Sequence, residues 1–271
     1  MIAHNQTIIR RISLYAGLIM AFCLRAQGAT VYINQNPALV DGGALVAGAQ
    51  LRASTNSWDM ALSNGSGFNG SHAVDDDLAV IFSLPAKNYT FSLQYLAGQG
   101  FIFNVRDNGT GQVTTQAWGT FTSPPAGTVV ATLGGRTPLQ PFDAVQIEAR
   151  ATANRASTTF SNLVFTSADL STSGSFYGAS LNNRTTIGGQ PMGTATQDLL
   201  ADVDLSQHSW TLSGNVTFMR SLLGGGSSND VALTLNIANV AGGAAIPAPE
   251  PSGVLLLAGA AGMMLSRRRR K

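Results

Sequence analysis

Two histidines, His72 and His208, are the side chains in the central part of the chain that could exchange a proton near neutral pH. A Ser-His-Asp hydrolase would need one of them beside a serine and an aspartate. The sequence has no Gly-x-Ser-x-Gly motif to mark such a serine, and no strand, glycine loop and helix unit to hold a phosphate or a dinucleotide. We therefore predict no catalytic residue, no cofactor and no enzymatic activity. A hydrolase with an unrecognised site is the alternative left open.

A run of three acids, Asp75, Asp76 and Asp77, lies in a stretch rich in asparagine and glycine. Clustered carboxylates are ligands that Ca²⁺ prefers, so a calcium site is one interpretation. Neighbouring side chains of an extended chain point in opposite directions, however, and the spacing of an EF-hand is absent. We expect a solvated loop here and predict no metal site.

Aromatic side chains could stack on the rings of a sugar. The candidates are Trp58, Trp118, Trp210 and Tyr177. Trp118 and Trp210 follow the alternation of their surroundings, which instead predicts that they are core residues. Trp58, between Ser57 and Asp59, is the strongest candidate for an exposed ring.

Alternation of apolar and polar residues dominates the middle of the chain. Tyr89, Phe91, Leu93 and Tyr95 alternate with polar residues, which places the large side chains on one face of a strand. Similar patterns predict strands over 101–106, 113–121, 128–133, 145–149, 160–166, 210–218 and 231–237. We predict an all-β domain over 29–240, an antiparallel β-sandwich with a jelly-roll-like layout, in which Gly224 to Ser228 form a hairpin loop. An irregular second subdomain over 172–201 is the alternative.

The positive charge of the chain is confined to its two ends. Of 16 basic residues, three precede residue 29 and five are the last five residues. The span 29–251 keeps eight basic residues and all 14 acidic residues, a net charge of −6. Such a body has no dense basic face, so we predict no nucleic-acid partner. The single cysteine, Cys23, excludes a disulfide in the body, and Phe22 before it argues against a lipoprotein signal.

Residues 1–28 have the features of a secretory signal peptide. Two arginines precede an apolar run over 12–24, and small residues follow it. We predict passage through the secretion machinery and cleavage by signal peptidase between Gly28 and Ala29. The alternative is an uncleaved anchor, but the apolar run is shorter than the roughly 20 residues of a spanning helix.

Residues 249–271 contain three features in a fixed order. A Pro-Glu-Pro motif comes first, then an apolar stretch over 254–265, then a basic end. The motif is Pro249, Glu250 and Pro251, and the basic end is Arg267, Arg268, Arg269, Arg270 and Lys271. An α-helix over 252–266, rising about 1.5 Å per residue, reaches about 22 Å, so a single short transmembrane helix would barely span a hydrocarbon layer of roughly 30 Å. The basic end would act as the cytoplasmic stop and leave the body on the outer side.

This order resembles the PEP-CTERM sorting signal of Gram-negative bacteria. The resemblance implies that exosortase, a membrane enzyme, recognises the Pro-Glu-Pro motif and processes the tail. The protein would be anchored transiently in the inner membrane and then reach the cell surface or the extracellular space. A plain tail anchor is the alternative. Residues 241–248 would be a spacer between body and tail.

Three segments of the body are similar to choice-of-anchor modules, β-rich domains joined to bacterial surface anchors. They are Gln116 to Phe121, Phe160 to Phe165 and Trp210 to Gly214. The similarity implies a surface location without a known catalytic chemistry. We therefore predict an exported, non-enzymatic cell-surface or extracellular-matrix protein. The alternative is a carbohydrate-binding module, with an extracellular polysaccharide as its partner.

Overall fold

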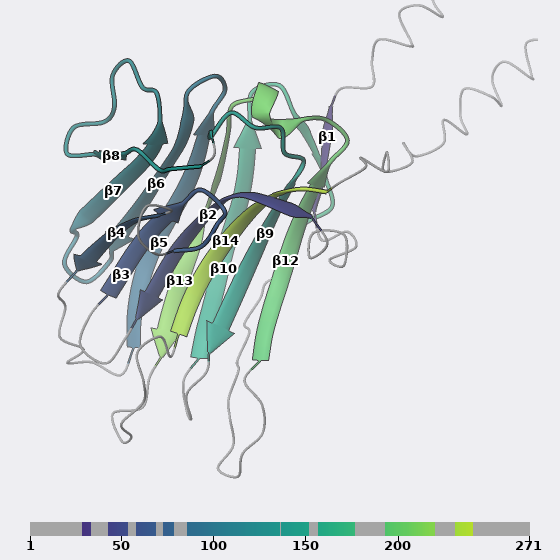
Figure 1. Ribbon diagram of the computed structural model, residues 1–271. Helices are drawn as coiled ribbons and strands as arrows, with labels where there is room; N and C mark the ends of the chain where they lie inside the picture. The colour runs from purple at the N-terminus through teal and green to yellow at the C-terminus, as the bar shows by residue number, and fades with distance from the viewer. Residues whose placement is uncertain are drawn as a thin grey trace, which may run out of the picture.

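The structure is a computed structural model, and most of its described residues are in strands. It describes residues 29–33, 43–53, 58–68, 73–78, 86–135, 137–151, 157–176, 193–219 and 231–240. The helical element among them is a short 3₁₀ turn, η2, at Leu205–Gln207 (Figure 1). The predicted all-β class is confirmed for this part of the chain.

The described strands form two sheets. They are β1 (Thr30–Ile33), β2 (Ala44–Ala53), β3 (Trp58–Ser63), β4 (Ala73–Leu78), β5 (Ala86–Leu96), β6 (Gly100–Asp107), β7 (Val113–Gly119), β8 (Val129–Ala131), β9 (Ala144–Ala151), β10 (Ser157–Ser167), β11 (Ser171–Ser173), β12 (Gly193–Ala201), β13 (Trp210–Met219) and β14 (Val231–Asn239). The eight-stranded sheet has the order β11-β1-β12-β9-β14-β2-β3-β4, and the six-stranded sheet has the order β10-β13-β5-β6-β7-β8.

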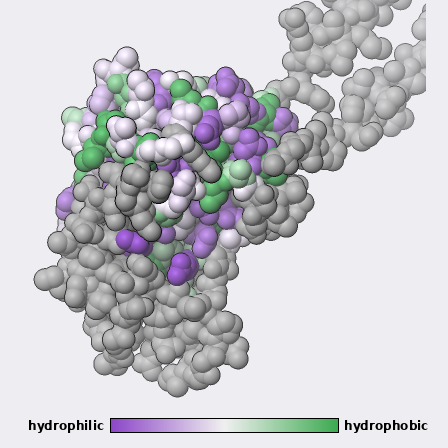
Figure 2. Space-filling model, viewed as in Figure 1, coloured by the Kyte–Doolittle hydropathy of each residue, from purple (hydrophilic) through white to green (hydrophobic). Residues whose placement is uncertain are grey.

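One apolar core lies between the two sheets. In β13 the buried residues alternate with partly exposed ones from Trp210 to Phe218, as the sequence pattern predicts. An aromatic cluster fills one end of the core, where the ring of Tyr95 lies 5.1 Å from that of Phe142 in an edge-to-face contact. On the face shown in Figure 2 the described residues form a mixture of small hydrophilic and hydrophobic areas.

The eight strands predicted from alternation are all present as β5 to β10, β13 and β14, but the expectation of purely antiparallel sheets is wrong. β1 pairs with β11 in parallel, and β7 pairs with β8 in parallel. Both parallel pairs contain a three-residue strand at a sheet edge. A parallel partner must return toward the start of its neighbour, and here the return is short, because β8 pairs only with Gln116 to Trp118 at the end of β7.

Two predictions about the C-terminal half are also corrected. The segment 172–201 is not a second subdomain where it is described, because β12 pairs with both β1 and β9 in the larger sheet. β13 and β14 do not form a hairpin around Gly224 to Ser228, because they belong to different sheets. The two strands face the same core from opposite sides, each with an apolar face toward it. Alternation alone cannot distinguish two strands that face each other across a core from two strands that pair within one sheet.

The acidic run does not form a loop. Asp75, Asp76 and Asp77 are part of β4, the edge strand of the larger sheet, and Asp77 pairs with Asp59 of β3. A charged edge strand discourages pairing with other chains, which explains why acidic residues are compatible with a strand at this position. The prediction failed because a run of charges hides the alternation from which strands are recognised.

Candidate functional site

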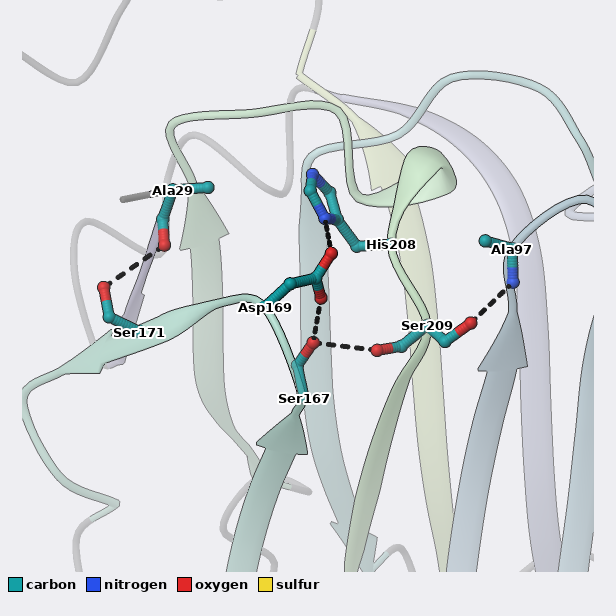
Figure 3. Close-up of polar contacts among 7 residues, drawn as sticks. All are labelled: Ala29, Ala97, Ser167, Asp169, Ser171, His208 and Ser209. Carbon is teal, nitrogen blue, oxygen red and sulfur yellow. Dashed lines mark hydrogen bonds and ion pairs between the residues drawn. The ribbon is translucent and has the colours of Figure 1, made fainter. Parts of the chain in front are cut away.

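A cluster of polar side chains lies at the end of the sandwich where β10 ends and β13 begins. Ser167 pairs with Trp210 in the register of these strands, so the residues that follow Ser167 lie beside those that precede Trp210. This brings His208 to Asp169, with 2.6 Å between His208 Nδ1 and Asp169 Oδ2 (Figure 3).

The cluster continues through two serines. The hydroxyl of Ser167 lies 2.8 Å from Asp169 Oδ1 and 2.8 Å from the backbone oxygen of Ser209, and these two acceptors share its single proton (Figure 3). The hydroxyl oxygen of Ser209 accepts a hydrogen bond of 3.0 Å from the backbone nitrogen of Ala97, just after β5. Three strands of the smaller sheet are therefore connected at this end.

Hydrogen bonds favour the ionised form of the Asp169 carboxyl. The hydrogen bond from His208, followed by the one from Ser167, lowers the pKa of Asp169 below its usual value. The Asp169 side chain is 56% exposed and that of His208 is 22% exposed, so water screens the pair. The contact therefore orients the two side chains more than it stabilises the fold.

The arrangement contains the residue types of a Ser-His-Asp triad but not its connectivity. In a triad the histidine accepts the proton of the serine, and the aspartate holds the far side of the histidine ring. Here the acceptors within reach of the Ser167 hydroxyl are Asp169 Oδ1 and the backbone oxygen of Ser209, and no hydrogen bond joins Ser167 to His208 in the described structure. Nothing in this geometry would activate Ser167 as a nucleophile.

An open groove of about 300 Å³ lies next to the cluster. The residues that line it are Gln94, Thr166, Ser167, Ala168, Ser209, Trp210 and Thr211. Five of them have hydroxyl or amide side chains, and no charged residue is among the described residues of its wall. Its volume is at the lower end of the roughly 300–1,000 Å³ of small-molecule sites. The groove is therefore a candidate binding site.

The aromatic candidates do not form a platform on this surface. Trp118 and Trp210 are only 3% and 2% exposed, which confirms the prediction that they are core residues. Trp58 begins β3, but its side chain and all of Tyr177 lie outside what the structure describes.

Acidic side chains near η2 have structural partners. Asp204 Oδ1 accepts hydrogen bonds from the backbone nitrogens of Ser206, at 2.9 Å, and Phe142, at 3.2 Å. Across the described residues, no group of three histidine, cysteine or acidic side chains is arranged to hold a metal ion. The aspartates at this end therefore act as hydrogen-bond acceptors for the backbone.

Of the residues predicted to be processed, Ala29 is described. Its backbone oxygen accepts hydrogen bonds from the nitrogen of Ser171, at 3.0 Å, and from the Ser171 hydroxyl, at 3.2 Å (Figure 3). Gly28, the Pro-Glu-Pro motif and the basic end of the chain lie outside the described residues. Within the part that the structure describes, there is no helix long and apolar enough to cross a membrane.

Neither a protein-family model nor a curated protein matches the chain. The similarities to PEP-CTERM tails and to choice-of-anchor modules therefore stay predictions, based on the residues that carry them.

Sequence reasoning missed both the contact of His208 with Asp169 and the groove. The sequence does contain one signal for the groove. In three predicted strands, Gln94, Thr166 and Thr211 are at the polar positions of the alternation, which predicts that their side chains face outward. The missing information was the order β10-β13-β5, because alternation identifies strands without showing which strands are neighbours.

Proposed function

We propose that this protein is an exported, non-enzymatic cell-surface or extracellular-matrix protein that is sorted by its C-terminal tail. In this proposal signal peptidase removes residues 1–28, the helix over 252–266 holds the protein transiently in the inner membrane, and exosortase recognises Pro249, Glu250 and Pro251. The protein then reaches the cell surface or the extracellular space. The support for the tail is the order of motif, apolar stretch and basic end in the sequence.

The observation that carries the proposal is how closely the sandwich adjoins both processing regions. β1 starts at Thr30, one residue after the predicted cleavage site, and its partners on both sides are strands of the same sheet. Cleavage between Gly28 and Ala29 would leave this strand whole, whereas cleavage further on would remove part of it. β14 ends at Asn239, so only a short spacer separates the body from the Pro-Glu-Pro motif.

The jelly-roll-like layout also belongs to the proposal. Its support is that consecutive strands change sheets repeatedly, since β9, β12 and β14 lie in the larger sheet and β10 and β13 lie in the smaller one. An experimental structure of the body would test this layout by its strand order.

The sorting proposal is tested by fractionating cells that contain an exosortase. Three versions of the protein are compared: the full chain, a version ending at Ala248, and the full chain with Glu250→Ala. We expect the full chain to pass through the membrane and appear outside at a lower mass, starting at Ala29. The version ending at Ala248 should be released without a membrane stage. Glu250→Ala, which keeps the apolar stretch, should stay in the membrane at its unprocessed mass.

Two results would contradict the proposal. One is that the full chain and the version ending at Ala248 are found in the same membrane fraction, with masses that differ only by the residues missing from the shorter version. The other is that the full chain stays in the cytosol with residues 1–28 attached.

A further inference from the structure

The outer face of the six-stranded sheet is a polar surface built of rows that run across the strands. On β10, β13 and β5 most large apolar side chains face the core, and hydroxyl and amide side chains face outward, together with the exposed Val164 and Met219. The strand register aligns these polar side chains from one strand to the next. The rows can therefore be compared by the hydrogen bonds that their side chains make with one another.

Three of the rows form hydrogen bonds within the sheet. In the first, the Thr217 hydroxyl donates to Asn88 Oδ1 at 2.7 Å. In the second, the Thr90 hydroxyl donates to Asn215 Oδ1 at 3.0 Å. In the third, Asn104 Nδ2 donates to the Ser92 hydroxyl at 3.3 Å and Asn104 Oδ1 accepts from Thr115 at 2.7 Å. These rows use much of their hydrogen-bonding capacity internally.

The fourth row, Thr166, Thr211 and Gln94, differs from the others. The register pairs Thr166 with Thr211 and Thr211 with Gln94. In the described structure the side chains of these three residues make no hydrogen bond to one another or to other protein groups. Two hydroxyl groups and an amide, each of which can both donate and accept, are therefore available along one line of the surface.

This available row lines the groove of about 300 Å³. Ser167, Ala168, Ser209 and Trp210 complete the wall. The two serines are fixed, Ser167 by Asp169 and Ser209 by Ala97. His208 in turn orients Asp169 across 2.6 Å (Figure 3). A ligand entering the groove would meet side chains on rigid strands, so binding would need little ordering of the protein.

The chemistry of the wall indicates which ligands fit. A ligand with many hydroxyl groups can satisfy paired donors and acceptors, and a groove without charged groups gives no compensation for burying an ionised group. The carboxylate of Asp169, which binds Ser167, would repel an anion, and so would the net charge of −6 of the span 29–251. These conditions select a neutral polyhydroxylated ligand.

We infer that the groove formed by Gln94, Thr166, Ser167, Ser209 and Thr211 binds a neutral sugar unit of an extracellular polysaccharide. This inference rests on the proposed export of the protein, because only an exported body would meet such a polymer. Of the aromatic positions predicted from the sequence, Trp210 belongs to the wall of the groove, but its side chain is only 2% exposed, so the hydroxyl and amide side chains would make the polar contacts with the sugar.

Binding is tested on the full chain, purified in a detergent without a sugar headgroup so that the detergent does not compete. The probes are neutral hexasaccharides of β-1,4-linked glucose, β-1,4-linked mannose and α-1,6-linked glucose, with an alginate hexamer as the anionic comparison. Titration calorimetry gives the affinity for each. We expect at least one neutral probe to bind, and to bind more tightly than alginate.

The variant Thr166→Val with Thr211→Val removes two hydroxyl groups from the groove with little change in side-chain shape. At about fivefold for each lost hydrogen bond, the affinity should fall roughly 25-fold. The matched control is Thr90→Val with Thr217→Val, which removes two hydroxyl groups from internally bonded rows of the same face. The control should bind as the unmodified chain does, to within about twofold.

Thermal unfolding shows whether each variant is folded, and Gln94→Leu replaces the double variant if that one does not fold. The inference is overturned if no neutral probe binds, if alginate binds as tightly as the neutral probes, or if the groove variant and the control bind equally. Failure to bind would leave the fractionation result for the sorting proposal unaffected. A wrong location in the fractionation test would likewise not change the affinity measured on the purified protein. Failure of the binding inference and failure of the sorting proposal are therefore distinguishable.

Discussion

The backbone nitrogen of Thr30 donates a hydrogen bond to Asp202 Oδ1 over 2.8 Å. In return, the backbone nitrogen of Asp202 donates to the Thr30 oxygen over 3.2 Å. The first residue of β1 is thus fixed to the segment that follows β12, and the next three residues, Val31 to Ile33, are buried. The beginning of the body is an integral part of the larger sheet.

Replacing Asp202 with alanine should destabilise the fold. Asp202→Ala removes the acceptor for the Thr30 nitrogen, and we expect the free energy of unfolding to fall by about 1 kcal/mol. Asp202→Asn keeps an acceptor oxygen and should lose less. Urea unfolding measures both values. Equal losses in the two variants would show that the hydrogen bond to Thr30 is not the cause.

The stability of the turn between β6 and β7 should depend on pH through Asp107. Burial alone would raise the pKa of Asp107, but the backbone hydrogen bonds from Gly109 and Thr110 and the ammonium of Lys87 outweigh it and lower the pKa. A lowered pKa in the folded state means that this carboxylate stabilises the fold above its unfolded pKa, and that the stabilisation is lost as the pH falls through the folded pKa. Asp107→Ala should therefore cost about 1–2 kcal/mol at neutral pH.

Urea unfolding near neutral pH and in acid measures this difference, which should shrink as the pH falls through the folded pKa and the carboxyl gains its proton. Lys87→Met is the control. It removes the ion pair of 3.3 Å but keeps the turn hydrogen bonds of Asp107, so it should cost less than Asp107→Ala. A loss for Asp107→Ala that is the same at both pH values would contradict the role of the charge.

Gly119→Ala should destabilise the sheet more than a substitution at another glycine with positive φ. Gly119 faces Gly100 across β6 and β7, and a Cβ added at Gly119 would collide with the backbone oxygen of Gln99. We expect a loss of about 3 kcal/mol from this collision and the unfavourable φ of +152° together. Gly127 also has a positive φ, +78°, but open space around it, so Gly127→Ala should cost only about 1 kcal/mol. Thermal unfolding of both variants compares them, and equal losses would rule out the collision.

Removing His208 should raise the pKa of Asp169. The hydrogen bond from His208 is the largest cause of the lowered pKa of Asp169, and the one from Ser167 is the next. His208→Ala should therefore give the larger rise and Ser167→Ala the smaller one, in a carboxyl ¹³C NMR titration. Because the folded pKa is lowered, the contact stabilises the fold above the unfolded pKa and is lost as the pH falls through the folded one. An unchanged pKa in His208→Ala would contradict the contact.

Alternation was enough to predict the strands with one apolar and one polar face. β5 and β13 are of this kind, because each lies between the core and the surface. β4 carries three acids in succession and β12 begins in a polar segment, so neither shows a clear period of two over its length. Local pattern therefore identifies strands that alternate, including the edge strands β8 and β10, and misses strands that do not.

The candidate site could not be predicted because its parts meet only through pairing. Asp169 and His208 are 39 positions apart, and nothing near either residue indicates the other. The available row of the groove also depends on β13 lying between β10 and β5. Non-local pairing is decided by the packing of the whole core, which no single segment of the sequence specifies.

β14 ends beside the start of β9, where Asp143 Oδ1 accepts a hydrogen bond of 2.8 Å from the nitrogen of Val240. β14 is also an interior strand, antiparallel to both β2 and β9. Antiparallel hydrogen bonds run perpendicular to the strand, so a pull applied at Val240 along β14 would load the bonds on both sides in shear at the same time. A body tethered by this end would therefore resist drag from flowing liquid far better than one pulled open from an edge strand, where the bonds would break one after another.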